Sequence, residues 1–415
     1  MKMDEPIINS LLDTDVYKAS CSRLAYSDVG GLWNRGVRYK FINRTSSVPL
    51  ARHIPPVALQ RQVDEICKLR FQPDEIDFIS TIHPALSDSG YRAALADVRL
   101  PRVIVSEVDG QLDLAIEGVW GATTWLEIPL LAAINEMYVR SIVGDDLPFV
   151  LARGISKVHN KTTLLGKYPE LRFSWFATRR RAFREWERIV FESFVEAIPE
   201  QMVSCSNMWL AKEFGWKAGG TMPHEVIMMF AALAAMDGDN TLLNAQNQLY
   251  DTWWELFGGP LSIALSDTFG SKHFFRTFDE NRSQKFWGAR QDSGDPFWWG
   301  EAYIQMLQSF GVNPRGKMAL FSDGLTPKDM VALFLHFHRR VDVGFGPGTN
   351  LSFDLGIKPL SIVIKLSEVM DDEGRWVSAV KLSDNPAKAI GTPDEVARYM
   401  RVFQYEPGET VQPRY

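Results

Sequence analysis

Cysteine is scarce in this sequence of 415 residues, and it has no long apolar run and no strong excess of one charge. The three cysteines, Cys21, Cys67 and Cys205, are too few for a disulfide framework and suit a reducing compartment, and their spacing matches no zinc site. No apolar run reaches the ~18 residues of a membrane-spanning helix. The N-terminus also lacks the apolar segment of a signal peptide. We therefore expect a cytoplasmic protein with no membrane partner.

The charge and composition narrow the class further. A formal net charge of −6 argues against a general nucleic-acid binder, which usually carries a basic face. Hydrophobic residues make up 46% and charged residues 23%, which is the balance of a globular protein and not of a disordered one. The length suggests about two domains, or one large α/β barrel with a second module.

In the second part of the chain, short apolar segments alternate with longer amphipathic ones. This alternation indicates βαβ units and a parallel sheet, either open or closed into a barrel. The strands are predicted at 171–177, 201–206, 261–266, 286–291, 317–322 and 341–345.

The first and last parts of the chain have a mixed pattern. A strand is predicted at 36–43, a helix at 59–69, and two strands within 103–118 around the turn pair Asp109-Gly110. An antiparallel hairpin is predicted at 361–369 and 375–382. We expect residues 1–118, completed by 361–415, to form one module and residues 119–360 to form the other.

Polar and glycine-rich segments follow the predicted strands at the same end. Because the carboxyl ends of parallel strands meet at one edge and build active sites, six such segments favour one shared site over six unrelated turns. The segments are ATRRR (177–181), SCSN (204–207), SDTFG (266–270), RQDSGDP (290–296), FSDGL (321–325) and GFGPGTN (344–350).

Two of these segments suggest anion binding. Arg179, Arg180 and Arg181 stand just before a predicted helix, where a bound anion would offset the unfavourable placement of positive charge, although pairing with Glu185 or Glu187 explains them equally well. Glycines in 344–349 let backbone N–H groups approach a phosphate. By contrast, 311–317 only mimics a P-loop, because Met318 replaces the required Ser or Thr and a strand follows instead of a helix.

A histidine and several aspartates could carry chemistry. His224 opens a predicted helix, a position that favours its neutral, nucleophilic form, although a structural role is the commoner one for such a residue. Acidic residues at the strand ends would hold magnesium or ribose hydroxyls near phosphates, or would simply cap turns. These are Asp267, Asp292, Asp295 and Asp323.

In order along almost the whole chain, these motifs resemble those of the nicotinate phosphoribosyltransferase family. Besides the loops named above, the resemblance is carried by LLDTDVYK (11–18), YKFINR (39–44), EIPLLAAINEMY (127–138), SNMWLA (206–211), GTMPHE (220–225), LSDTFG (265–270), GARQDSGDP (288–296) and KLSDNPAK (381–388).

The resemblance implies an α/β fold, namely the irregular α/β barrel of type II phosphoribosyltransferases with a second, discontinuous α/β module. It implies a homodimer with shared active sites. The implied reaction joins nicotinate to phosphoribosyl pyrophosphate, giving nicotinate mononucleotide and pyrophosphate. Magnesium would be the cofactor, and ATP would be a co-substrate coupled through a phosphohistidine.

The resemblance also implies roles for individual residues. Tyr17, from the partner subunit, and Phe176 would sandwich the pyridine ring, Arg179 would neutralise its carboxylate, and Thr178, Ser206 and Asn207 would complete the substrate-binding site. His224, the residue phosphorylated by ATP, would be catalytic together with Arg290, Asp292 and Asp267, and the last two would hold the metal. The phosphates would lie against Asp323, Gly324, Gly346, Gly348 and Thr349.

The sequence leaves three alternative functions to be weighed. The related nicotinamide enzyme carries an aspartate in place of Ser206, which would repel a carboxylate, so nicotinate is favoured over nicotinamide. Quinolinate phosphoribosyltransferase is shorter than this chain and richer in basic residues, so it is less favoured than the nicotinate enzyme. A catalytically silent homologue is suggested by two departures from the family pattern, Trp175-Phe176-Ala177 in place of Asp-Phe-Gly and Ser204-Cys205 in place of Gly-Thr.

Overall fold

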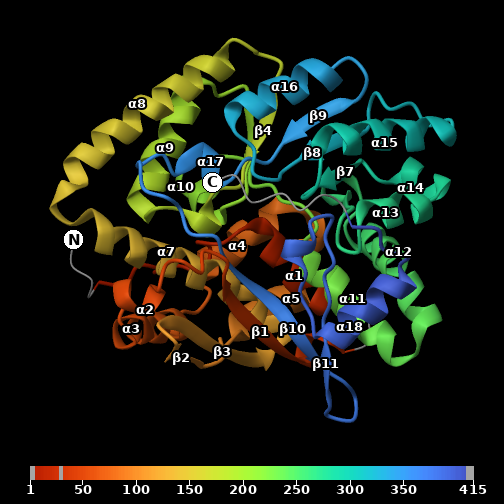
Figure 1. The fold of residues 1–415 in the computed structure, drawn as a ribbon, viewed down its shortest axis with the longest axis horizontal. Helices are drawn as coiled ribbons and strands as arrows, with labels where there is room; N and C mark the ends of the chain where they lie inside the picture. The colour runs from red at the N-terminus through yellow and green to blue at the C-terminus, as the bar shows by residue number, and fades with distance from the viewer. Residues whose placement is uncertain (1–4, 28–30, 408–415) are drawn as a thin grey trace.

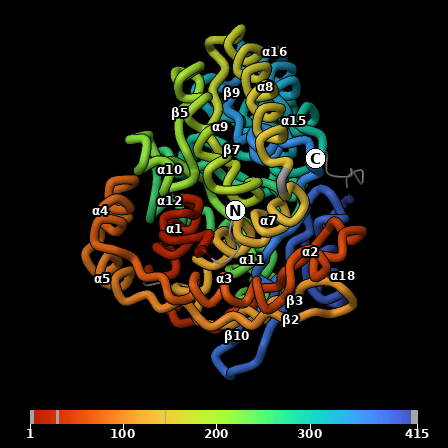
Figure 2. The backbone as a smooth tube through the Cα atoms, turned by 90° about the vertical axis from the view of Figure 1, so that its left-hand side faces the viewer, coloured from red at the N-terminus to blue at the C-terminus, as the bar shows by residue number. Residues whose placement is uncertain are grey.

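The computed structural model describes residues 5–27 and 31–407, and two β-sheets organise them (Figure 1). One is a five-stranded antiparallel sheet in the order β11-β10-β1-β3-β2, and the other is a six-stranded sheet in the order β5-β4-β9-β8-β7-β6. Figures 1 and 2 both show the antiparallel sheet in the lower half of the view and the other sheet, with its helices, above it.

The six-stranded sheet is parallel throughout and matches the sequence prediction. Each strand is only three or four residues long and falls inside a predicted segment. Among the described residues no pairing joins β5 to β6, so this barrel is irregular and open on one side. The strands are β4 (Arg172–Trp175), β5 (Met202–Cys205), β6 (Ile263–Leu265), β7 (Gly288–Gln291), β8 (Met318–Phe321) and β9 (Asp342–Phe345).

Amphipathic helices cover these strands. In α9 (Arg184–Ala197) the buried residues Trp186, Val190 and Phe194 recur at helical spacing and form the buried face of the helix. The other helices of this half are α8 (Leu147–Gly166), α10 (Met208–Glu213), α12 (Asp239–Leu256), α13 (Ser271–Thr277), α14 (Glu280–Lys285), α15 (Pro296–Ser309), α16 (Pro327–Phe337) and α17 (Thr349–Ser352).

The antiparallel sheet joins the two ends of the chain. Its strand β10 comes from the C-terminal part and pairs with β1, from Val37 opposite Val369 to Asn43 opposite Ile362. Around it lie α2 (Leu50–His53), α3 (Pro56–Lys68), α4 (Pro73–Ile82), α5 (Ser89–Asp97) and α18 (Pro393–Val402). The strands are β1 (Gly36–Asn43), β2 (Val103–Val108), β3 (Gln111–Val119), β10 (Ile362–Met370) and β11 (Trp376–Ser378).

The structure contains both predicted hairpins, but only the first has the predicted length. The β2–β3 hairpin is confirmed, and its turn residues Asp109 and Gly110 have φ values of 51° and 76°, the left-handed conformation that a tight hairpin requires. The second hairpin is shorter than predicted, because β11 ends at Ser378 and the chain then leaves the sheet to form a bridge between Lys381 and Ile390. The division into modules at 118/119 stays a prediction.

Three helices lie between the two sheets and connect them. They are α1 (Val16–Ala25), α7 (Glu127–Val143) and α11 (His224–Met236), and most of their residues are buried. Figures 1 and 2 both place α1 between the two sheets. Of the helices in the described part of the chain, none combines the length and apolar character that a membrane span requires.

Candidate active site

A cavity lies where the carboxyl ends of the parallel strands face the antiparallel sheet. Loops after β4, β5, β7, β8 and β9 line one side of it, and α1, α7, β10 and residues 381–390 contribute to the other. The cavity brings together most of the residues predicted for the site, namely Tyr17, Phe176, Arg179, Ser206, His224, Arg290, Asp292, Asp323, Gly324, Gly346, Gly348 and Thr349.

One part of the cavity, here called the aromatic end, is formed by Asp15, Tyr17, Glu127, Phe176, Arg179 and Ser206. Tyr17 Oη donates to Glu127 Oε2 over 3.4 Å, and an Arg179 guanidinium nitrogen lies 4.0 Å from Glu127 Oε1. The two aromatic rings and the arginine therefore come from three separate segments, α1, the loop after β4 and the short 3-10 helix Thr178–Arg180.

Tyr17 corrects one prediction. Its side chain was expected to enter the site from a partner subunit, but it lines the cavity of its own chain. The reason is the position of α1, which is held against the parallel sheet because the Val16 N–H donates to the Ser206 carbonyl over 2.7 Å and Asp15 forms a β-bridge with Asn207.

Buried ion pairs fix Glu127 beneath the aromatic end. Lys18 Nζ lies 2.7 Å from Glu127 Oε2 and 2.5 Å from Glu225 Oε2, and Lys365 Nζ lies 3.1 Å from Glu127 Oε1. Burial raises the pKa of Glu127, but Lys18, Lys365 and Arg179 outweigh it and hold the pKa well below its ordinary value. Glu127 is thus a fixed negative charge that orients these cations.

Gly346 allows the loops after β4 and β9 to approach each other closely. A Cβ added at Gly346 would lie 2.4 Å from Cδ2 of Phe176, and the Phe176 N–H donates to the Pro347 carbonyl over 3.2 Å. Only glycine leaves room for the ring at this position. The residue predicted to bind phosphate therefore also sets the position of Phe176.

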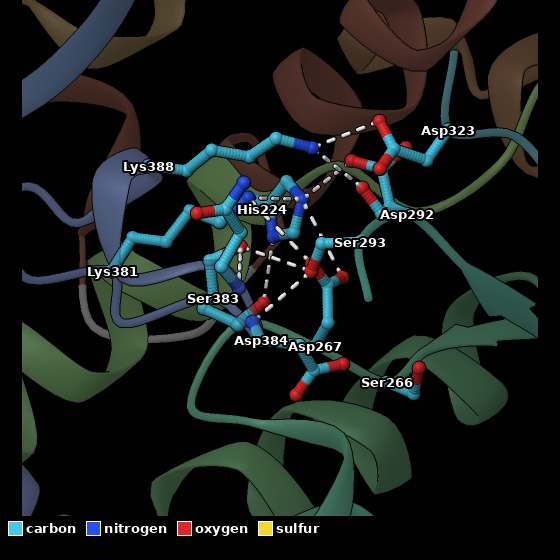
Figure 3. A network of polar contacts seen from close by, with 12 residues as sticks. His224, Ser266, Asp267, Asp292, Ser293, Asp323, Lys381, Ser383, Asp384 and Lys388 are labelled. Atoms are coloured by element: carbon cyan, nitrogen blue, oxygen red, sulfur yellow. Dashed lines mark hydrogen bonds and ion pairs between the residues drawn. The ribbon is translucent and has the colours of Figure 1, made fainter. Parts of the chain in front are cut away.

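His224 belongs to a second group, here called the carboxylate end, with Arg290, Asp292, Asp323, Lys381 and Lys388. Figure 3 shows His224 among the two aspartates and the two lysines of this group. His224 Nε2 lies 2.9 Å from Asp292 Oδ2 and 2.8 Å from Lys381 Nζ, and its Nδ1 lies 2.9 Å from Thr268 Oγ1. Burial, with help from Lys381, lowers the pKa of His224 to about 4, so the ring is neutral near pH 7. The helix α11 begins at His224 itself, with Pro223 at its N-cap.

The predicted metal residues also meet at this end. Ligand atoms of His224, Asp267 and Asp292 lie within 4.8 Å of one another. Asp267 is fully buried, its Oδ2 accepts from Ser293 Oγ, and its Oδ1 has no hydrogen-bond partner. A buried carboxylate oxygen without a partner is costly unless a cation occupies the space beside it, so the residues present fit a hard divalent cation.

Lysines from the C-terminal part complete the carboxylate end. Lys388 Nζ lies 2.8 Å from Asp323 Oδ1, and Ser322 Oγ donates to Asp292 Oδ1 over 2.8 Å. Burial lowers the pKa of Lys381 to about 8. Gly324 and Thr349 line the same cavity, and the Asn350 side chain donates to the Gly324 carbonyl over 2.8 Å. This end therefore combines lysines with carboxylates, an arrangement suited to phosphates and a metal ion.

Comparisons with known proteins agree with this geometry. The model of the nicotinate phosphoribosyltransferase family matches residues 171–407, and that of the family's N-terminal domain matches residues 12–135. The solved nicotinate phosphoribosyltransferase from Porphyromonas gingivalis is 29% identical with a TM-score of 0.85, and 96% of this chain and 100% of that chain are covered. The one from Vibrio cholerae is 30% identical with a TM-score of 0.83, covering 96% and 94%.

The chain belongs to the nicotinate phosphoribosyltransferase family. The resemblance drawn from the sequence motifs is thereby confirmed, and so is the fold class that it implied. The protein is an enzyme of this type.

Of the departures from the family pattern, Ala177 lines the cavity, whereas Trp175, Ser204 and Cys205 lie outside it. Trp175 is fully buried, donates from Nε1 to Glu187 Oε1 over 3.1 Å, and packs edge-on against Phe191 with ring centroids 5.4 Å apart. Ser204 Oγ lies 2.7 Å from Ser174 Oγ, and Cys205 is fully buried. None of the three residues lines the cavity. The substitutions at Trp175, Ser204 and Cys205 therefore change the packing behind the nicotinate phosphoribosyltransferase site, and only Ala177 changes its wall.

Three residues predicted for the site are not part of its lining. Thr178 Oγ1 donates to Glu187 Oε1 over 2.8 Å, and Asn207 Nδ2 donates to Asp13 Oδ1 over 2.9 Å, so both side chains support the wall from behind. Asp267 also lies behind the lining, 3.7 Å from His224 Nε2. Arg181 pairs with Asp13 and Glu187, which bears out the ion-pair explanation for that arginine.

Some cavity residues had no predicted role. They are Asp15, Arg44, Glu127, Arg180, Lys365, Lys381 and Lys388. Most of them stand in motifs that already carried the family resemblance, such as 11–18, 39–44 and 381–388. Their charge, within such a motif, was the sequence feature that could have predicted them as site residues. Lys317 of the rejected P-loop pattern instead donates to the carbonyls of Gln284 and Phe286, outside this cavity.

Proposed function

We propose that this enzyme transfers the phosphoribosyl group of phosphoribosyl pyrophosphate to the ring nitrogen of nicotinate and couples turnover to ATP through His224. The observation that carries the proposal is that one cavity joins two ends of different chemistry. The aromatic end offers two rings and an arginine, and the carboxylate end offers lysines, aspartates and a neutral histidine.

The aromatic end supports binding of a flat anion. A pyridine ring would lie between the rings of Tyr17 and Phe176, and Arg179 would supply the positive charge that its carboxylate needs. Ser206 adds a hydroxyl group to the same wall. Holding the ring in this way positions its nitrogen for attack and lowers the entropic cost of reaction.

The carboxylate end supports departure of pyrophosphate. As the bond to the leaving group breaks, positive charge develops on the ribose and negative charge on the pyrophosphate, so the reaction needs fixed charges more than a protein nucleophile. Arg290 and Lys388 would stabilise the leaving group, and the backbone around Gly324 and Gly348 would receive the phosphate of the ribose. Asp267 and Asp292 would hold magnesium, which supplies charge to the leaving pyrophosphate when bound.

The protonation state and the neighbours of His224 support its phosphorylation by ATP. Its low pKa keeps one ring nitrogen unprotonated at neutral pH, so this nitrogen can attack the terminal phosphorus while the bond to ADP breaks. Lys381, 2.8 Å from Nε2, would pair with the charge of the attached phosphoryl group. Phosphorylation would thereby change the charge of the carboxylate end and hence its affinity for pyrophosphate.

We propose a homodimer, but one whose subunits do not share their active sites. The family resemblance suggested a homodimer, with Tyr17 reaching into the partner subunit, but Tyr17 lines the cavity of its own chain. A dimer with separate, complete sites is therefore the form of assembly that we propose.

The reaction can be tested in one assay with phosphoribosyl pyrophosphate and magnesium. Nicotinate or nicotinamide is offered with and without ATP, and mononucleotide and ADP are measured. We expect nicotinate mononucleotide, with ADP formed in step. Nicotinamide mononucleotide as the main product would contradict the assignment of the base, and folded protein that forms neither product would favour a silent homologue.

The role of His224 needs its own variant. His224→Ala should form nicotinate mononucleotide without ATP but should lose the stimulation by ATP, because no phosphoryl group can be attached. Incubation with ATP labelled at the terminal phosphate should label the unchanged enzyme and leave the variant unlabelled. Equal ATP stimulation in both proteins would show that His224 does not couple the two reactions.

A further inference from the structure

Asp15 contributes a carboxyl group to the aromatic end of the cavity. It precedes α1 but its side chain makes no capping hydrogen bond to that helix. Only 6% of the residue is exposed, it lines the cavity, and its Oδ1 is buried with no hydrogen-bond partner. An unpartnered polar atom in a residue that lines a binding cavity calls for an explanation, and a change of protonation or of contacts on ligand binding supplies one.

Charges of both signs act on Asp15. Burial is the main influence and raises its pKa to about 7, with the Ser206 hydrogen bond and Arg179 acting in the opposite direction and Glu187 and Glu127 adding to the rise. The Tyr17 hydroxyl and the Cys205 thiol, both neutral near pH 7, also face the carboxyl group. Asp15 therefore exchanges its proton close to neutral pH.

The Ser206 hydroxyl group connects the protonation state of Asp15 to recognition of the pyridine substrate. A hydroxyl group has one hydrogen to donate and can also accept. If Asp15 is ionised, the Ser206 hydrogen is drawn to it, and the cavity meets an acceptor that suits the N–H groups of an amide. If Asp15 is protonated, it donates to Ser206, whose own hydrogen is then free to meet a carboxylate.

We propose that Asp15 takes up a proton when nicotinate binds and thereby determines which base the enzyme accepts. This inference rests on the proposed transfer to nicotinate and extends it. The protonated carboxyl group removes a negative charge beside the nicotinate carboxylate and turns the Ser206 hydroxyl into a donor. The ionised carboxyl group favours nicotinamide instead.

Calorimetry of the wild-type enzyme tests the proton directly. Nicotinate binding is measured at pH 5.5 and pH 8 in buffers of different ionisation enthalpy, which gives the number of protons exchanged. We expect almost no uptake at pH 5.5 and close to one proton at pH 8, since Asp15 is then ionised in the free enzyme. Nicotinate that binds at pH 8 with no proton exchange would overturn the inference while leaving the proposed function intact. Absence of nicotinate binding would contradict the proposed function itself.

Asp15→Asn separates Asp15 from other titrating groups, because its amide can donate to Ser206 at every pH. In the wild-type enzyme kcat/KM for nicotinate should fall about tenfold per pH unit above the pKa of Asp15, and its ratio to kcat/KM for nicotinamide should fall likewise. Asp15→Asn should remove both dependences and the proton uptake. Asp394→Asn, at an exposed position of α18, is the matched control and should behave as wild type. Identical pH profiles for wild type and Asp15→Asn would overturn the inference.

Discussion

Two carboxyl groups of the same cavity, each near an arginine, respond to their surroundings in opposite ways. At the carboxylate end, burial raises the pKa of Asp292, but Arg290, His224 and Lys381 outweigh it and hold the pKa well below its ordinary value. At the aromatic end, burial raises the pKa of Asp15 to about 7, and Arg179 does not outweigh it.

The difference lies in how the nearby cations are balanced. Arg179 shares its charge with Glu127, and Glu127 and Glu187 both oppose ionisation of Asp15, whereas Asp292 faces several cations at once. Burial alone therefore does not set the charge of a carboxyl group, and the balance of surrounding charges decides it. The aromatic end is adjusted to receive one more negative charge from a ligand, and the carboxylate end keeps its own negative charges to hold cations.

The same substitution at both ends gives the largest expected contrast. Asp292→Asn removes a charge that the carboxylate end requires, so kcat/KM should fall about 10²–10³-fold, the usual cost of deleting one group that stabilises developing charge. Asp15→Asn should leave nicotinate turnover at pH 6 nearly unchanged. Steady-state kinetics at fixed magnesium compares the two. Equal losses in both variants would remove the distinction between the two ends.

Arg179 should matter for one substrate only. Arg179→Gln removes the cation that pairs with the nicotinate carboxylate, and hydrogen bonds to charged groups are worth about 1.5–3 kcal/mol, which corresponds to about a 10–100-fold rise in KM for nicotinate. KM for phosphoribosyl pyrophosphate should change little. Arg188→Gln, on the surface of α9, serves as the control. A parallel rise in both KM values would place Arg179 in contact with the phosphates.

A mixing experiment tests whether both ends come from one chain. Tyr17→Ala and Arg290→Ala each damage one end, and their mixture should stay as inactive as the separate variants, because both residues belong to the same cavity. If the site were shared between two subunits of a dimer, mixed dimers would carry one intact site, and about a quarter of the activity would return. Recovery of activity would therefore contradict the cavity seen within one chain.

The two ends differed in how well the sequence predicted them. Apolar strands followed by Asp, Arg and Gly predicted the carboxylate end, because the carboxyl ends of parallel strands meet at one edge whatever the detailed packing. His224, Arg290 and Asp292 are close together for that reason. The resemblance to the family named the aromatic residues but placed Tyr17 in a partner subunit.

The charge balance of the aromatic end was out of reach of sequence patterns. Glu127 meets Lys18 and Lys365, which are 109 and 238 positions away in the chain, and no local spacing connects them. Thr178 and Asn207 were misplaced for a similar reason: whether a side chain in a loop faces the cavity or the wall behind it depends on packing that the motif does not record.

The stability of the ligand-free enzyme gives the smallest of the expected effects and needs no substrate. Asp15 has a folded pKa of about 7, above the value of about 3.9 in an unfolded chain, so the folded state binds more protons between these values. The stabilisation from Asp15 is therefore complete below pH 4 and is lost as the pH rises through 7. Between pH 5 and pH 8 the wild type should lose about 2–3 kcal/mol that Asp15→Asn does not lose. Thermal unfolding should show the Tm difference shifting by a few degrees in favour of Asp15→Asn, with Asp394→Asn following the wild type. If the difference stays constant across this range, Asp15 is ionised throughout, and the two ends of the cavity do not differ in the charge of their carboxyl groups.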